Sequence, residues 1–299
     1  FFFSVSHAMI DKNLYLEHPA VTAWSWSDVR EWRRDNRVQV SDDDSVPKPI
    51  RTWIEAAFPE FLTAELEASS FASPTAIQSQ SWPIALSGRD MIGLASTGSG
   101  KTLCFALPAI VHINAQEHLQ PGDGPIALML APTRELAVQI KGECDRFGAS
   151  SRVKNTAVYG GVPKGPQQRD LAHGVEIVIA TPGRLLDFMD AAQTNLRRCT
   201  FLVLDEADRM LDLGFEPQLR SVISQASPER QTLMWSATWP REVQILANEF
   251  LTNPILVQVN DAAKLRVSDT IEQKFEVCDE NEKYPRFMHF LQSINDGKS

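Results

Sequence analysis

Cysteine is scarce in this sequence, and its few cysteines lie far apart. The 299 residues hold four of them, Cys104, Cys144, Cys199 and Cys278. No two have the spacing of a zinc-binding pair or of a disulfide framework, so neither kind of site is predicted. We interpret them as reduced thiols of an intracellular protein.

Long apolar runs are also missing. A helix that spans a bilayer needs about 20 predominantly apolar residues, and no stretch of this sequence provides them. The opening FFFSV is too short for a signal peptide, and no basic residue precedes it. The sequence therefore favours a soluble protein, and a first residue other than Met suggests a chain cut from a longer one.

Basic residues do not outnumber acidic ones. The chain has 29 Lys and Arg against 38 Asp and Glu, a formal net charge of -9. Proteins that coat nucleic acid do so mainly through Lys and Arg contacts to phosphate, so the overall charge argues against such a protein. Only local features can outweigh that argument.

Short apolar segments alternate with helix-length segments through most of the chain. Helical patterns occupy residues 134–148 and 241–251, among others. The strand-like segments are residues 90–95, 126–131, 175–180, 201–205, 232–237 and 255–259. This alternation is typical of βαβ units, and it predicts an α/β domain with a mostly parallel sheet and helices on both faces.

Residues 1–48 are predicted to form a polar N-terminal extension. Within it, residues 25–36 predict a short amphipathic helix, with Ser25 as N-cap and Asp28 three positions on. We interpret its arginines as a solvated helix face, with RNA contact as the alternative. These arginines are Arg30, Arg33 and Arg34.

The main domain is assigned to residues 49–260, and residues 261–299 follow it as a polar connection and a short tail. The tail contains one strand-like piece, residues 270–278, and one amphipathic helix, residues 282–294. One strand and one helix cannot bury a core by themselves. We therefore expect the tail to be the beginning of a second domain.

The stretch GLASTGSGKT, residues 93–102, has most of a phosphate-binding loop. The usual signature, Gly-x-x-x-x-Gly-Lys-Thr, puts Ala95 where its first Gly belongs, and Gly93 is out of register. The loop nevertheless follows a strand and precedes a helix, as phosphate binding requires. A glycine turn without a ligand is the alternative.

Each residue type in the loop suits a nucleotide and Mg²⁺. Glycines let successive backbone N–H groups converge on a phosphate, Lys101 reaches the β- and γ-phosphates, and Thr102 binds Mg²⁺. The residues predicted to bind nucleotide here are Ser96, Thr97, Gly98, Ser99, Gly100, Lys101 and Thr102.

A second candidate element is FLVLDEAD, in which Asp205 and Glu206 follow an apolar strand. Open α/β sheets bind ligands at the carboxyl ends of their strands. We expect Asp205 to hold Mg²⁺ and Glu206 to orient and deprotonate the attacking water. An acidic first turn of a helix is the alternative, and the upstream loop favours the catalytic interpretation.

These motifs resemble those of the DEAD-box RNA helicases, whose name spells the tetrapeptide found here at Asp205-Glu206-Ala207-Asp208. The resemblance covers roughly Trp53 to Val259 and is to the amino-terminal RecA-like lobe, a P-loop NTPase fold. The family loop commonly begins with Ala, which accounts for Ala95. The stretch from Gly160 to Phe188 is similar to the branch that acts in nuclear RNA metabolism and splicing.

The segment SFASPTAIQ is similar to the family's adenine-binding motif. The resemblance implies that Gln78 bonds the adenine edge, that Phe71 stacks on the ring and that Thr75 belongs to the same site. Ser70 and Trp53 stand where Gly and Phe are usual. A side-chain amide that faces N6 and N7 selects adenine over guanine, which offers two acceptors there. Taken alone, without the neighbouring motifs, the segment favours a helix start with Gln78 exposed.

Other segments are similar to the family's RNA-contacting motifs. Thr133 and Arg184 are expected to bond phosphates, Gly161 and Gly183 to let backbone amides approach the strand, and Arg134 to support this surface. The complete set is Pro132, Thr133, Arg134, Gly160, Gly161, Thr181, Pro182, Gly183 and Arg184. A few well-placed groups can bind the RNA backbone without a broadly basic protein surface.

The segment Ser236 to Thr238 resembles the motif that hydrogen-bonds Asp208 and links hydrolysis to RNA release. We count Ser236 and Thr238, with Lys101, Asp205 and Glu206, as the catalytic set. The family's second lobe carries a His-Arg-x-Gly-Arg motif that completes the ATP site, and that string does not occur in this sequence.

The resemblance implies an ATP-dependent RNA helicase that binds ATP or ADP with Mg²⁺. It also implies that the protein contacts the backbone of single-stranded or duplex RNA. It further implies ribonucleoprotein or splicing proteins as partners and a location in the nucleus, with the cytoplasm as a second location. One alternative is a nucleotide- and RNA-binding module, or an interaction platform, without useful catalysis. A DNA-directed helicase or another P-loop ATPase is the more distant alternative.

Overall fold

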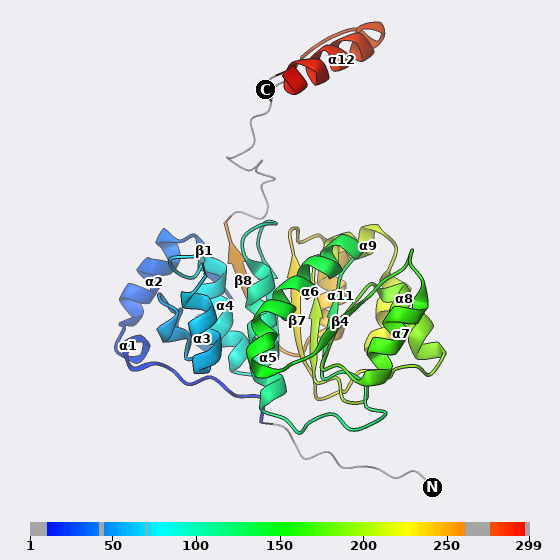
Figure 1. The fold of residues 1–299 in the computed structure, drawn as a ribbon. Coiled ribbons are helices and arrows are strands. Elements are labelled where there is room, and N and C mark those ends of the chain that lie inside the picture. Colours follow the sequence, from blue (N-terminus) through cyan, green and yellow to red (C-terminus); the bar gives the residue numbers. More distant parts are fainter. Residues whose placement is uncertain (1–10, 42–44, 70, 261–275, 297–299) are drawn as a thin grey trace. The chain divides into compact units, whose positions relative to one another are not determined.

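One mixed sheet runs through the part of the computed structural model that is described, residues 11–41, 45–69, 71–260 and 276–296. Its strand order is β1-β8-β2-β7-β6-β3-β5-β4, and β1 alone runs antiparallel to its neighbour. Figure 1 shows β1 beside β8 at one end of the sheet. The strands are β1 (Val38–Val40), β2 (Met91–Leu94), β3 (Ala127–Leu130), β4 (Asn155–Val158), β5 (Ile177–Ala180), β6 (Phe201–Leu204), β7 (Gln231–Ser236) and β8 (Ile255–Val259). The predicted, mostly parallel α/β fold is confirmed.

The two faces of the sheet bury different helices. The longer helices on one face are α4 (Ala76–Leu86), α5 (Lys101–Asn114) and α6 (Arg134–Gly148). On the other face lie α7 (Lys164–His173), α8 (Pro182–Asp190), α9 (Ala207–Asp212), α10 (Glu216–Ile223) and α11 (Arg241–Phe250). Successive strand residues point to opposite faces, so Met129 joins the first core and Leu128 the second. Burial on both faces explains the continuous apolar runs.

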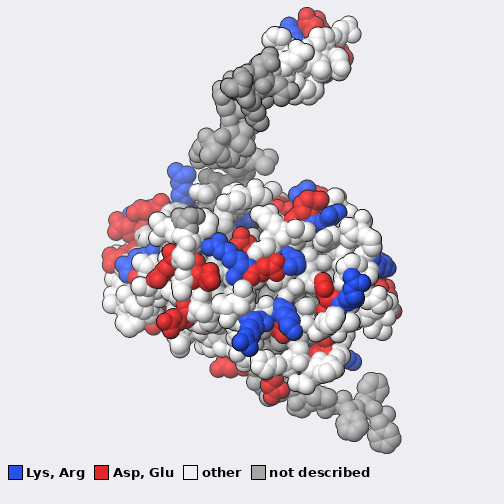
Figure 2. Space-filling view, in the orientation of Figure 1, with Lys and Arg blue, Asp and Glu red and all other residues white. Residues whose placement is uncertain are grey.

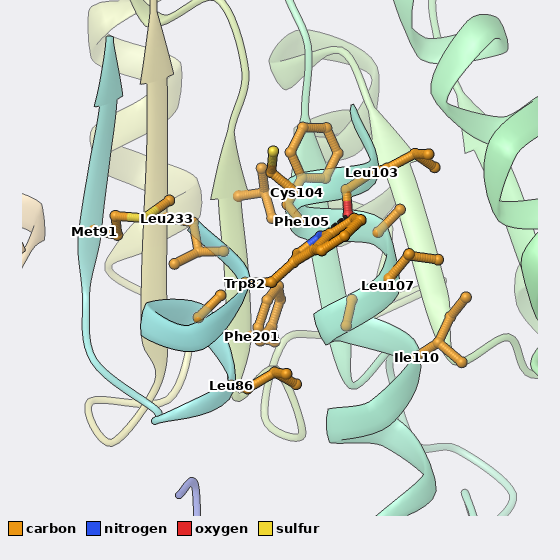
Figure 3. Packing of buried hydrophobic residues seen from close by; sticks show 14 of the residues in the cluster. Trp82, Leu86, Met91, Leu103, Cys104, Phe105, Leu107, Ile110, Phe201 and Leu233 are labelled. Atoms are coloured by element: carbon orange, nitrogen blue, oxygen red, sulfur yellow. Dashed lines mark hydrogen bonds between the residues drawn. The ribbon is translucent and has the colours of Figure 1, made fainter. Parts of the chain in front are cut away.

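A tryptophan joins α4 to α5 in the first core. Trp82 is fully buried, and its indole N–H donates to the Leu103 carbonyl oxygen over 2.9 Å (Figure 3). Trp53 and Phe58 pack against the same ring, with ring centroids 5.9 and 5.1 Å away. A buried Trp with its polar atom satisfied fixes how two neighbouring helices sit.

Residues that precede the main domain pack onto it. Short helices α1 (Pro19–Thr22), α2 (Trp26–Asp35) and α3 (Glu60–Glu67) and the 3-10 turn η2 (Ile54–Ala56) precede α4. Val21 and Val46 are buried in the first core, and β1 extends the sheet beside β8. The described residues of the predicted extension, 11–41 and 45–48, thus belong to the same compact unit as the main domain.

The predicted helix after Ser25 is confirmed, but one of its arginines is not solvated. The Ser25 hydroxyl accepts from the backbone N–H of Asp28, as the capping pattern predicts. The interpretation of Arg33 as part of a solvated face is wrong, because Arg33 is 4% exposed and donates to Gln80 in α4. The contact spans 47 positions, which no local pattern reveals.

The described residues of the tail, 276–296, belong to a separate unit. Its predicted amphipathic helix is confirmed as α12 (Glu280–Asp296). The strand predicted at 270–278 lies mostly outside the described residues. Among the helices of the described ranges, none is both long and apolar enough to cross a membrane.

His112 in α5 is a buried titratable group away from the catalytic set. It is 2% exposed, and its Nε2 lies 2.8 Å from Thr200 Oγ1. Burial lowers the pKa of His112 to about 4, and the charge of Lys12 acts in the same direction. The imidazole is therefore neutral in the folded protein. As the pH falls, the same side chain takes up a proton first in the unfolded state, where its pKa is about 6.5.

We predict that this histidine makes the fold acid-sensitive. Its contribution to the free energy of unfolding is complete above pH 6.5 or so and declines as the pH falls toward 4. In urea titrations from pH 7.5 to 4.5, the protein should lose about 2 to 3 kcal/mol more stability than His112→Gln, which has no ionisable group there. Parallel stability curves for the two proteins would contradict this.

Candidate functional site

Three neighbouring strands carry the predicted nucleotide motifs to one edge of the sheet. The glycine-rich loop follows β2, Ser236 ends β7, and Asp205 follows β6. Leu94 pairs with Ser236, and Leu204 pairs with Met234, so the three carboxyl ends are adjacent. The order β2-β7-β6 brings the glycine-rich loop close to two segments that lie more than a hundred residues further along the chain.

The loop needs glycine at two positions, and Ala95 is not one of them. Gly98 and Gly100 have φ of 76° and 87°, which L side chains rarely adopt. A Cβ on Gly100 would also lie 2.7 Å from Gln78 Nε2. Ala95 has no positive φ, and its N–H donates to Ser236 O over 3.3 Å. Alanine is therefore compatible with the loop.

Gly93 serves packing instead of phosphate binding. It lies in β2 beside β7, paired with Trp235. A Cβ at position 93 would lie 2.2 Å from Cζ3 of the Trp235 ring. Any larger residue would push apart the two strands that carry the loop and Ser236.

The loop holds polar groups with few protein partners. Lys101 is 7% exposed, and its ammonium donates to the Ala95 carbonyl oxygen over 2.9 Å. The buried Ser99 hydroxyl has no hydrogen-bond partner among the described residues. A loop with an available lysine and an orphaned hydroxyl at a helix N-terminus fits a phosphate group.

The two acidic residues after β6 have different surroundings. Asp205 is 3% exposed, and burial raises its pKa to about 6, although nearby Lys101 opposes that rise. Glu206 is less buried, and its carboxylate pairs with Arg209 over 3.3 Å. Its backbone is left-handed, with φ of 53°, and its N–H donates to Asp205 Oδ1. A non-glycine residue held in this region is common at functional sites.

A Mg²⁺ ion fits the predicted ligands. Carboxylate and hydroxyl oxygens suit this hard cation, which usually takes only one or two protein ligands beside phosphate and water. Asp205 is a buried carboxylate whose ionised form a nearby dication would stabilise. No group of three or more His, Cys, Asp or Glu able to hold a metal by itself occurs in the described ranges. Asp205 and Thr102 thus fit a cation shared with a nucleotide.

A hydrogen-bonded pair joins the segments after β6 and β7. Asp208 Oδ2 accepts from the Thr238 backbone N–H over 2.9 Å and from the Thr238 hydroxyl over 2.7 Å. This is the contact expected from the Ser236 to Thr238 motif. Ser236 contributes differently, because its hydroxyl donates to the Thr238 carbonyl oxygen and shapes the turn.

Gln78 and Thr75 connect the start of α4 to the glycine-rich loop. Gln78 Oε1 accepts from the Thr75 N–H, and Gln78 Nε2 donates to the Gly100 carbonyl oxygen over 3.1 Å. The Thr75 hydroxyl donates to Ser99 O. Gln78 is 4% exposed, so the alternative of an exposed glutamine is wrong, whereas Phe71 is 55% exposed.

The predicted RNA motifs occupy the other half of the same sheet edge. They follow β3, β5 and β4, which are neighbours in the sheet. Thr133 caps α6 through its hydroxyl, and Thr181 and Pro182 begin α8. Gly161 has φ of 77° and open space around its Cα. Two helix N-termini and a glycine turn thus present backbone N–H groups, which suits phosphate.

The two arginines of this half both contact neighbouring groups of the protein. The Arg134 guanidinium lies over the Tyr159 ring, 5.1 Å from its centroid, in agreement with a supporting role. Arg184 was expected to bond phosphate. Here its side chain is 11% exposed and donates to the Val162 carbonyl oxygen, which holds the turn after β4.

Charges of both signs occur together on the protein surface. Figure 2 shows Lys and Arg side chains interspersed with Asp and Glu over the face in view. Since the chain carries a formal net charge of -9, contacts to RNA would depend on individual placed groups more than on a broad basic field.

Comparison with known proteins identifies the family. A family model described as DEAD/DEAH box helicase matches residues 75–246. The chain belongs to the DEAD/DEAH box helicase family. It is 59% identical over 288 residues to the ATP-dependent RNA helicase DBP2 of Chaetomium thermophilum, covering 96% of this chain and 51% of that protein. The corresponding protein of Candida albicans is 59% identical over 283 residues, with coverage of 95% and 50%.

Solved structures show the same fold. The RNA helicase Prp28 from Chaetomium thermophilum bound to ADP superposes with a TM-score of 0.75 at 35% identity, over 93% of this chain and 66% of that one. The yeast DEAD-box splicing factor Prp28 gives the same TM-score at 29% identity. This DEAD/DEAH box chain spans about half the length of the curated relatives it matches.

Some features of this DEAD/DEAH box site were not predicted from sequence. The packing of Gly93 on Trp235 depends on strand order, and no spacing in the sequence indicates it. The attachment of Gln78 to the Gly100 carbonyl depends on where α4 packs. A capping box from Thr75 to Gln78 is readable in the sequence and would have placed this amide at the helix start.

We predict that Asp208 and Thr238 are energetically coupled. Thr238→Val removes the hydroxyl donor and keeps the backbone N–H, and should lower the free energy of unfolding by about 1 to 2 kcal/mol. Thr238→Ser, the matched control, retains the hydroxyl and should lower the free energy of unfolding by less. In a double-mutant cycle with Asp208→Asn, monitored by urea denaturation, strictly additive losses would show that the contact carries no energy.

Proposed function

We propose that this chain is the nucleotide-binding part of an ATP-dependent RNA helicase, which couples RNA-stimulated ATP hydrolysis to duplex unwinding or ribonucleoprotein remodelling. ATP or ADP with Mg²⁺ would occupy the edge formed by β2, β7 and β6. RNA would lie along the edge formed by β3, β5 and β4. The observation that carries the proposal is this division of one sheet edge, with the Asp208–Thr238 contact inside the nucleotide half.

The residues of the nucleotide half have separable tasks. The Lys101 ammonium can turn from the Ala95 carbonyl to a phosphate oxygen, a charge-assisted contact that is stronger than the one it leaves. Asp205 and Thr102 would hold Mg²⁺, which would neutralise phosphate charge. Glu206, next to Asp205 and more exposed, would accept a proton from the attacking water.

Adenine selection would fall to Gln78. Each atom of its amide has capacity left in the present contacts: Oε1 accepts one hydrogen bond and Nε2 donates one. A second acceptor position on Oε1 suits adenine N6–H, and the second Nε2 hydrogen suits N7. The exposed Phe71 ring would cover the base. The ADP bound to Prp28 in the similar structure supports this assignment.

RNA contact would use backbone groups more than side-chain charge. The N-termini of α6 and α8 and the turn at Gly161 would bind successive phosphates with little sequence preference. Partners in ribonucleoprotein assemblies and a nuclear location are part of the proposal. They rest on the similarity to DBP2 and to a splicing factor.

A non-catalytic nucleotide- and RNA-binding module is the second candidate. It concerns these 299 residues taken alone, which contain no His-Arg-x-Gly-Arg string. An arginine that stabilises the transferring phosphoryl group contributes about 10³ to 10⁵ in rate in related ATPases. ATPase assays with and without single-stranded RNA separate the candidates. A longer protein that contains this chain and a second lobe should hydrolyse ATP and respond to RNA.

We predict that two substitutions separate binding from chemistry. Lys101→Ala removes a charged donor to phosphate and should weaken ADP·Mg²⁺ binding about 10- to 100-fold, measured by calorimetry on the 299-residue chain. Glu206→Gln should leave that affinity within a factor of about two and lower turnover of the longer protein by about 10² to 10⁴. Loss of ADP binding in Glu206→Gln as complete as in Lys101→Ala would refute this division of roles.

A further inference from the structure

Helix α4 lies between the candidate nucleotide site and the residues at the start of the chain. Every residue of α4 from Ile77 to Leu86 is buried. On one side it meets the glycine-rich loop, and on the other it meets residues 11–41 and 45–58, called the N-terminal segment below. A close-packed helix in this position cannot move against one neighbour without moving against the other.

The contact between α4 and the loop is made by side chains already assigned to the nucleotide. Gln78 Nε2 donates to Gly100 O, and the Thr75 hydroxyl donates to Ser99 O. The fit is tight, because a Cβ on Gly100 would lie 2.7 Å from Gln78 Nε2. A small shift of α4 would therefore change where the Gln78 amide points relative to the loop.

The contact between α4 and the N-terminal segment is a buried polar cluster. Arg33 Nε donates to Gln80 Oε1 over 2.9 Å, and Gln80 Nε2 donates to the Pro47 carbonyl oxygen over 2.9 Å. Arg33 Nη2 reaches the same carbonyl oxygen at 3.4 Å. Arg33 and Gln80 are 4% and 0% exposed. Hydrogen bonds of this kind are costly to break, because the separated groups would be left buried without partners.

Gln78 and Gln80 project in nearly opposite directions from α4. Residues two positions apart on an α-helix differ by about 200° around its axis. Gln80 therefore faces the N-terminal segment while Gln78 faces the loop. The backbone adds a second attachment on the Gln80 side, where the Ile50 N–H donates to Ser79 O over 3.0 Å.

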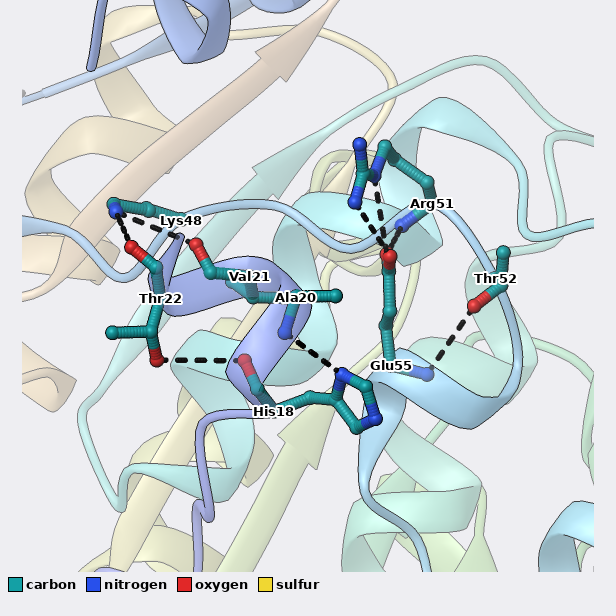
Figure 4. Close-up of polar contacts among 8 residues, drawn as sticks. All are labelled: His18, Ala20, Val21, Thr22, Lys48, Arg51, Thr52 and Glu55. Atoms are coloured by element: carbon teal, nitrogen blue, oxygen red, sulfur yellow. Dashed lines mark hydrogen bonds and ion pairs between the residues drawn. The ribbon is translucent and has the colours of Figure 1, made fainter. Parts of the chain in front are cut away.

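Other contacts hold the N-terminal segment together without bonding to α4. Lys48 Nζ donates to the carbonyl oxygens of Thr22 and Trp24, over 2.8 and 2.6 Å, at the end of α1. Arg51 pairs with Glu55 over 2.7 Å. Figure 4 shows the Lys48 contact to Thr22 and the Arg51–Glu55 pair. Lys48 thus offers a control for damage to the segment that leaves the Arg33–Gln80 contact in place.

We propose that Arg33 is a positioning residue for adenine recognition, acting on Gln78 through Gln80 and α4. The proposal rests on the proposed function, in which Gln78 reads the base. Arg33 touches neither nucleotide nor loop. It fixes the register of α4 against the N-terminal segment, and so the placement of the Gln78 amide above Gly100.

The test compares affinities for ADP·Mg²⁺ and GDP·Mg²⁺, measured by calorimetry on the 299-residue chain. Arg33→Met should raise the Kd for ADP about 2- to 30-fold and leave the Kd for GDP nearly unchanged, because the phosphate loop binds both nucleotides. Gln80→Met should reproduce the effect from the α4 side. The Arg33–Gln80 contact is removed in all three variants, so the double variant should raise the Kd for ADP by less than the product of the two single effects.

Lys48→Met is the matched control. It should lower the thermal midpoint of unfolding, as Arg33→Met should. It should also leave the ratio of ADP to GDP affinity at the value of the unmodified chain. If Arg33→Met and Gln80→Met weaken ADP and GDP binding equally, or weaken neither, the ratio of the two affinities is unchanged. Either result would overturn the positioning role alone. Equal affinity of the unmodified chain for the two nucleotides would overturn the adenine assignment and this inference with it.

Discussion

The parallel pairing of β7 between β2 and β6 is the constraint on which the candidate site depends. It brings the glycine-rich loop, the turn after Ser236 and the acidic residues after β6 to adjacent strand ends. The packing of Gly93 against Trp235 and the contact of Thr238 with Asp208 both require this order. With the strands in another order, the same motifs would be present in the sequence and would not meet.

The site keeps charge where the fold alone would favour apolar groups. Asp205 lies at the base of the site with its pKa raised to about 6 by burial, and Lys101 is buried nearby with a backbone carbonyl as its partner. A nucleotide and a cation would supply the partners that these groups lack, so binding should stabilise the fold. Locally unfavourable placements of this kind are expected where a sequence is selected for binding or chemistry.

Local patterns predicted much of this structure, and contacts between distant segments account for the rest. The six apolar strands, the helix after Ser25 and the loop before α5 each follow from neighbouring residues. Strand β4 was missed because Asn155 and Thr156 interrupt its apolar pattern, and β1 because it is a three-residue edge strand. The burial of Arg33 depends on Gln80, a partner far along the chain. Side-chain direction, as for Arg184, likewise depends on packing that the sequence does not display.

The most direct test is a map of backbone amide NMR shifts on titration with ADP·Mg²⁺ and, separately, with single-stranded RNA. The division of the sheet edge predicts that ADP·Mg²⁺ perturbs residues after β2, β6 and β7, including Gly100 and Glu206. RNA should perturb residues after β3, β4 and β5, including Thr133, Gly161 and Gly183. Overlapping sets of perturbed amides, or competition between the two ligands for one half of the edge, would contradict the account.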